Sequence, residues 1–174
     1  GGDFNGDGYG DMVVSGFGGN AQLHLGGPRG LQEAPADVAL FTGPNAHFVG
    51  DLNADGDADL IVQHWVTSIG VLSPFFVCYG NPEGVLGLRT QVINVWELHD
   101  TALGHNARGG DFNEDGYGDI ALSGNGDVAI FYGSSEGLGP PTRLESLYSG
   151  PGGDLTSNFG GKLAAGDFDG DGHL

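Results

Sequence analysis

The chain has 174 residues and a formal net charge of −18 at pH 7, from 23 acidic and only 5 basic side chains besides histidine. This balance excludes a generic nucleic-acid backbone binder, which needs clustered Lys and Arg. The 36 glycines stand between apolar segments and do not form a linker, so a chain of this length can bury a core. No apolar stretch reaches 18 residues, so we expect no membrane span.

An acidic motif begins at Asp3 and recurs at Asp51, Asp111 and Asp167, after 48, 60 and 56 residues. Its three complete copies read Asp-x-Asn-x-Asp-Gly-x-x-Asp, and the fourth begins Asp-x-Asp-x-Asp-Gly. Oxygen side chains at positions one, three and five surround a single point, as a hard cation such as Ca²⁺ requires, and glycine at position six permits a sharp turn. Position seven offers its backbone carbonyl, and position nine is again Asp in the complete copies. The motif therefore predicts calcium loops, with Ca²⁺ as the cofactor.

The predicted metal ligands are the residues at these positions: Asp3, Asn5, Asp7, Tyr9 and Asp11; Asp51, Asn53, Asp55, Asp57 and Asp59; Asp111, Asn113, Asp115, Tyr117 and Asp119; Asp167, Asp169, Asp171 and His173.

An EF-hand is the competing interpretation of this motif. An EF-hand loop needs a bidentate Glu at its twelfth position and a helix on each side. Here the twelfth positions are Val14, Val62 and Leu122, each the last residue of a short apolar run. Such a run, bounded by glycine and acidic residues, indicates a buried strand. The motif therefore predicts a loop between two strands.

Short strands follow each complete loop in a constant order. The apolar runs are 12–14, 60–62 and 120–122; second strands ending in glycine are 21–27, 75–80 and 128–133; third strands are 38–41, 92–98 and about 143–148; and strands leading into the next loop are 46–50, 102–110 and 162–166. No window of a dozen residues free of Gly and Pro carries a 3.6-residue apolar period, so we expect no substantial helix.

Four strands of five or six residues with their turns fill about 40 to 50 residues, the size of a propeller blade. We therefore predict one all-β domain of antiparallel blades over residues 1–174. Its repeats span about 1–45, 46–100, 101–150 and, for the start of a fourth, 158–174. A β-helix or hairpin solenoid is the alternative, although its repeats are shorter. Closed propellers have about four to eight blades, and this chain carries about three. We expect a segment of a larger or oligomeric propeller.

The loops, followed by two strands and a Gly-Leu pair, resemble the FG-GAP (VCBS-type) repeats of integrin α-chain β-propellers and of many secreted microbial proteins. The stretch 159–172 carries the Phe-Gly pair, the strand and the loop together. The Gly-Ala-Pro element after the second strand is absent, and the Phe-Gly pair is clear only before the fourth loop. The resemblance implies calcium loops on one rim of the ring that hold each blade together. It does not imply integrin-like ligand recognition.

We find no constellation of residues that indicates catalysis, and we expect no enzyme. No pair of histidines has metal-ligand spacing, and no nucleophile-elbow pattern surrounds Ser15 or Ser123. Trp65 enters the longest insertion, 63–73, and is the aromatic residue best placed for contact with a ligand. Cys78 lies in an apolar run and is expected to be an inert core residue.

Weak acidic loops fill where calcium is millimolar, so we expect an extracellular protein, secreted or on the cell surface. The expected function is adhesion or structural protein interaction. A carbohydrate-binding lectin propeller is the alternative, and a propeller-type lyase or hydrolase is a more distant one. The expected partners are a protein or glycan ligand that the sequence does not identify, and further blades from a longer chain or from other copies.

Overall fold

The computed structural model describes residues 1–16, 20–32, 37–42, 45–63, 74–84, 90–93, 106–123, 127–145, 162–168 and 170. The secondary structure in these ranges is entirely β, which confirms the predicted fold class. The strands are β1 (Met12–Val14), β2 (Asn20–His24), β3 (Asp37–Thr42), β4 (Ala46–Gly50), β5 (Asp59–Gln63), β6 (Phe75–Cys78), β7 (Thr90–Ile93), β8 (Asn106–Gly110), β9 (Asp119–Ser123), β10 (Asp127–Phe131) and β11 (Pro141–Glu145).

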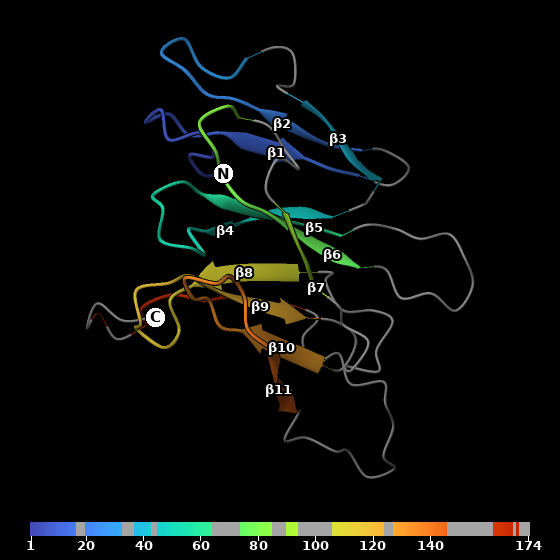
Figure 1. Ribbon diagram of the computed structural model, residues 1–174, viewed down its shortest axis with the longest axis vertical. Helices are drawn as coiled ribbons and strands as arrows, with labels where there is room; N and C mark the ends of the chain where they lie inside the picture. Colours follow the sequence, from blue (N-terminus) through green and yellow to red (C-terminus); the bar gives the residue numbers. More distant parts are fainter. Residues whose placement is uncertain are drawn as a thin grey trace.

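The strands form three antiparallel sheets in which each strand pairs with its neighbours in sequence. The first sheet is β1-β2-β3, the second is β4-β5-β6-β7 and the third is β8-β9-β10-β11. The central pairs have equivalent registers, with Leu60 opposite Cys78 in the second sheet and Ile120 opposite Phe131 in the third. The three sheets follow one another along the long axis of the molecule in sequence order (Figure 1).

Most predicted strands are present, and one prediction is wrong. The third strands begin slightly before their predicted starts, at Asp37, Thr90 and Pro141, and the strand predicted at 102–110 is present over 106–110. Residues 94–98, 102–105 and 146–148 of the predicted strands lie outside the described residues. Residues 162–166, by contrast, form no strand. The corresponding strands β4 and β8 pair with the strand that follows their loop. Residues 162–166 make no such pairing within the part of the chain that the structure describes.

Two apolar cores lie between successive sheets. The core between the first and second sheets contains Phe4, Leu23, Leu60, Val62 and Cys78, with further apolar neighbours. The core between the second and third sheets contains Val49, Leu52, Ile61, Phe75, Val77, Ile93, Ala107, Ile120, Leu122, Ala129, Phe131 and Leu138. The middle sheet is thus covered on both faces, which explains why its central strands β5 and β6 are mostly buried and lack a polar side. Cys78 is buried, which confirms its predicted place in the core.

Candidate metal loops

The first three loops share one pattern of hydrogen bonds that gathers their polar side chains. In the first loop, the Asp3 carboxylate accepts the N–H groups of Asp7 (3.1 Å) and Gly8 (2.7 Å), and Asp7 accepts the N–H of Tyr9 (2.9 Å). The Asn5 side-chain amide donates to Asp7 (3.2 Å). The same bonds recur in the second and third loops. Positions one, three and five of each loop are therefore brought together as the motif predicts.

Backbone conformation explains why the sequence folds in this way. Glycine at position six has a positive φ in all three loops, between 86° and 97°, which confirms the predicted sharp turn. Position four is also left-handed, and there two loops carry Ala54 (φ 58°) and Glu114 (φ 60°) in place of glycine. A side chain in this conformation is strained, so the surrounding hydrogen bonds must hold it. The residue type at this second left-handed position varies between the loops, so the motif alone does not indicate its conformation.

The ninth-position aspartates have a structural role that the spacing of the motif does not indicate. Asp59 is fully buried, and its two carboxylate oxygens accept the N–H of Leu52 (2.7 Å) and of Gly80 (2.8 Å). Asp11 and Asp119 make the equivalent pairs of bonds. Each carboxylate thus ties the start of its loop to the glycine after the second strand. The sequence signal for this contact is the glycine that follows the second strand in each of these three repeats.

Burial of the ninth-position acid changes its ionisation in the second loop. The pKa of Asp59 is raised from 3.8 to about 7, chiefly by burial and further by the charges of Asp55 and Asp51. The N–H donors of Gly80 and Leu52 oppose this shift, because they favour the charged carboxylate. A cation in the loop would, like these donors, lower the pKa of Asp59. The ionisation of Asp59 therefore depends on whether a cation occupies the loop.

In each of the first three loops, positions one, three and five offer two carboxylates and one amide, because the ninth carboxylate turns inward. In the described part of the chain, no group of three or more His, Cys, Asp or Glu side chains is arranged to hold a metal ion. The oxygen-only donors at positions one, three and five nevertheless have the chemistry that a hard cation accepts, together with the carbonyl at position seven. These residues fit calcium, and the ninth Asp as a direct ligand stays a prediction.

The fourth loop differs from the others where it is described. Asp167 accepts the N–H of Gly170 (2.6 Å), and Gly170, at position four, has the same left-handed conformation as in the other loops (φ 78°). The second-position side chain, however, is 88% exposed at Phe168, whereas Phe4 and Leu52 are fully buried. Asp169, Asp171 and His173 lie outside the described residues, as does Trp65.

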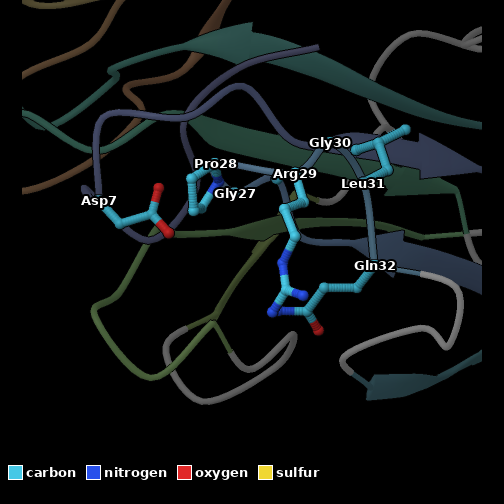
Figure 2. Close-up of a pocket in the computed structure, with 8 residues that line it drawn as sticks. Asp7, Gly27, Pro28, Arg29, Gly30, Leu31 and Gln32 are labelled. Atoms are coloured by element: carbon cyan, nitrogen blue, oxygen red, sulfur yellow. The ribbon is translucent and has the colours of Figure 1, made fainter.

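A pocket of about 420 Å³ adjoins the first loop. Asp7 lines it together with the turn Gly26, Gly27, Pro28, Arg29, Gly30, Leu31 and Gln32. Figure 2 shows the side chains of Arg29 and Gln32 extending to the same side of this pocket, away from Asp7. The equivalent turns of the second and third sheets carry Glu83 and Glu136 in place of Arg29. Of these three equivalent turns, the first therefore carries a basic side chain and the other two carry an acidic one.

A second titratable group lies near the joint between the second and third sheets. His47 is on β4, and burial, followed by the charge of Arg108, lowers its pKa from the ordinary 6.5. Its Nε2 atom is buried and has no hydrogen-bond partner among the residues that the structure describes.

The described ranges also contain no helix that is long and apolar enough to cross a membrane.

The antiparallel sheets are stacked face to face, and the same acidic loop directly precedes β1, β5 and β9, as expected of repeated β-propeller blades. The chain belongs to the FG-GAP-like repeat family, whose model matches residues 3–62 and 111–174. It is 32% identical over 133 residues to integrin alpha-PS5 and 34% over 136 residues to integrin alpha-PS3, both of Drosophila melanogaster. It is 31% identical over 150 residues to integrin alpha-7 of Rattus norvegicus. Each match covers 70% of this chain but only 11% to 13% of the relative.

Proposed function

We propose that this chain is a calcium-stabilised β-propeller module that acts outside the cell in adhesion or structural protein interaction, without enzymatic activity. The observation that carries the proposal is the oxygen-rich loop, repeated with one hydrogen-bond pattern directly before β1, β5 and β9 of the three sheets. Its similarity to integrin α-chains supports an extracellular, adhesive role. The chain spans only about an eighth of those proteins, so their whole activity is not transferred to it.

Positions one, three, five and seven of each loop would hold the calcium ion. When bound, Ca²⁺ supplies positive charge that offsets the repulsion between clustered carboxylates. In the second loop these carboxylates belong to Asp51 and Asp55, both on the exposed side of the loop. The buried Asp59 holds the loop closed from the other side. The metal would therefore stabilise the fold, and no feature of the loop calls for a substrate.

The outer face of the first sheet supports further blades as partners. Met12 and Val14 are 42% and 44% exposed, although they occupy the positions of Leu60 and Val62, which are fully buried against the first sheet. Leu31 is likewise 46% exposed, whereas its counterpart Leu138 is 8% exposed. Apolar side chains at these positions are covered wherever a preceding sheet is present in this chain. We propose that another blade covers them on the first sheet.

The joint between the second and third sheets shows what such a covering blade contributes. The side-chain amide of Gln91 donates to the carbonyl of Leu138 (3.0 Å) and accepts the N–H of the same residue (3.0 Å). The hydroxyl of Tyr79 donates to the same Gln91 oxygen (2.7 Å). The pocket beside Arg29 and Leu31 lies at the equivalent turn of the first sheet. We therefore interpret this pocket as a blade joint and not as a small-molecule site.

Thermal unfolding with and without a chelator tests the calcium role. If each complete loop has a Kd of about 10⁻⁴ M, millimolar calcium adds roughly 1.4 kcal/mol per site, or about 4 kcal/mol for three sites. Excess EDTA should then lower the Tm by many degrees. An unchanged melting curve in EDTA would contradict the proposal.

Two measurements test the partners. A glycan array should show no sharp, competable sugar binding, and such binding would favour the lectin alternative instead. Light scattering after size-exclusion chromatography should show association of copies, because the exposed apolar faces need a cover. A stable, monodisperse monomer of 17.8 kDa would contradict the requirement for further blades.

A further inference from the structure

The metal loops of neighbouring sheets are joined by direct backbone hydrogen bonds. The carbonyl of Asp3, at position one of the first loop, accepts the N–H of Ala58 (2.7 Å), at position eight of the second loop. The carbonyl of Asp51 accepts the N–H of Gly118 (3.0 Å) in the same way, one loop further along. A predicted metal ligand therefore also supplies the acceptor for the next loop. The link repeats at both joints of the molecule.

The peptide after the first ligand strengthens this link. The N–H of Phe4 donates to the buried Asp11 (2.7 Å), and its carbonyl accepts the N–H of Asn81 (2.9 Å) from the second sheet. The Phe4 side chain is fully buried in the core between the two sheets. The first turn of the loop is thus held from both sides. Any change in the position of Asp3 is transmitted to the docking of the second sheet.

Asp57 adds a side-chain contact that only the first joint has. It occupies position seven of the second loop, where the backbone carbonyl and not the side chain is the predicted ligand. Its carboxylate Oδ1 lies against Gly6, so closely that a Cβ at residue 6 would collide with it. Gly6 stands between the predicted ligands Asn5 and Asp7. The other loops have Tyr or His at position seven, so they lack this carboxylate.

We propose that Asp57 is a positioning residue that couples cation binding in the first loop to docking of the second sheet. Its negative charge favours a cation in the first loop, and its contact with Gly6 fixes the segment that carries Asn5 and Asp7. The backbone bond from Ala58 to Asp3 makes the coupling reciprocal, because a docked second sheet orders the first ligand. This inference rests on the proposed calcium binding, and its test separates the two.

Terbium luminescence can report the first loop alone, because Tb³⁺ replaces Ca²⁺ in oxygen sites and is sensitised by a nearby tyrosine. Tyr9 and Tyr117 occupy position seven of the first and third loops, and the second loop has Asp57 there. In a Tyr117→Phe background, the signal therefore reports the first loop, and its loss on Tyr9→Phe verifies the assignment. Asp57→Asn in this background removes the charge and keeps the shape. We expect Tb³⁺ affinity of the first loop to fall on the order of tenfold.

The matched control is Asp57→Asn in a Tyr9→Phe background, where the signal reports the third loop and its affinity should stay unchanged. If Asp57→Asn left the Tb³⁺ affinity of the first loop unchanged, the role of Asp57 would be overturned and calcium binding would remain intact. Absence of any sensitised signal in the unmodified chain would overturn both proposals.

Amide hydrogen exchange provides a readout that does not depend on luminescence. Addition of Ca²⁺ should slow exchange of the Ala58 amide, because its acceptor on Asp3 becomes ordered, and Asp57→Asn should reduce this protection. Gly10 holds position eight in the first loop and, within the described ranges, donates to no preceding loop, so it is the internal control. Equal calcium-dependent protection at Gly10 and Ala58 would indicate general stabilisation and would overturn coupling through the joint.

Discussion

Replacement of a ninth-position aspartate should destabilise the fold even without calcium. Asp119 is fully buried, and its oxygens accept the N–H of Phe112 (2.7 Å) and of Gly133 (2.9 Å). Asp119→Ala leaves both donors without an acceptor, the N–H of Gly133 in the interior and that of Phe112 in a half-buried position. An unsatisfied buried polar group costs about 1 to 3 kcal/mol and a half-buried one costs less, so we expect a loss of roughly 1 to 4 kcal/mol in the free energy of unfolding.

The control is Asp115→Ala, which removes a carboxylate from the exposed side of the same loop. Asp115 accepts the N–H of Tyr117 (2.9 Å), and water can replace this bond. Urea unfolding at a series of free calcium concentrations separates the two residues. Asp119→Ala should remain destabilising as calcium is lowered with a chelator, whereas the effect of Asp115→Ala should shrink to about 1 kcal/mol or less. If both variants lost their effect in chelator, the ninth Asp would act only through the metal, and our reasoning would be refuted.

Three further substitutions test the packing between sheets, the left-handed backbone of the second loop and the ionisation of the buried His47. Gly109→Ala should strongly destabilise the chain in chemical denaturation, because the added Cβ would collide with the carbonyl of Val49. Gly10→Ala is the control and should be nearly neutral, because a Cβ added there meets no atom within 4 Å. Ala54→Gly should stabilise the chain by about 1 kcal/mol, because it relieves a left-handed backbone; a loss of stability would show that this strain is not present. Burial lowers the pKa of His47, so at low pH the unfolded chain binds a proton more readily than the folded chain. The free energy of unfolding should therefore fall as the pH drops through 6.5 and below. His47→Gln should make this free energy less dependent on pH.

The repeat pattern was sufficient to predict the sheets because each strand pairs with its neighbour in sequence. Short apolar runs such as 60–62 and 120–122, set between glycines and acids, could only be buried in a stack of sheets. Residues 162–166 show the limit of this reasoning. Their sequence suits a strand, but a strand also needs a partner to satisfy its N–H and C=O groups, and the pattern does not supply one.

The loops were predicted as metal sites from residue type and spacing, which do not reveal where each oxygen points. Asp7 and Asp11 are both acids in one motif, yet one lies on the exposed side and the other accepts two backbone N–H groups in the interior. One of these donors, Gly26, lies fifteen residues along the chain from Asp11, beyond the reach of a local motif. Contacts between loops, such as that of Asp57 with Gly6, depend on how the sheets stack and have no signal within one repeat.

Each loop has a buried part and an exposed part. The ninth carboxylate accepts buried N–H groups, so the tie between the loop and its own sheet should persist when calcium is removed. The first and fifth carboxylates accept hydrogen bonds on the exposed side of the loop, and the backbone carbonyl of the first residue also accepts an N–H from the next loop. We therefore expect loss of the proposed calcium to act first on the joints between sheets and only later on the sheets themselves. Under chelation, the amides of Ala58 and Gly118 should exchange before those of the central strands β5 and β9, and simultaneous exchange of both sets would contradict this order.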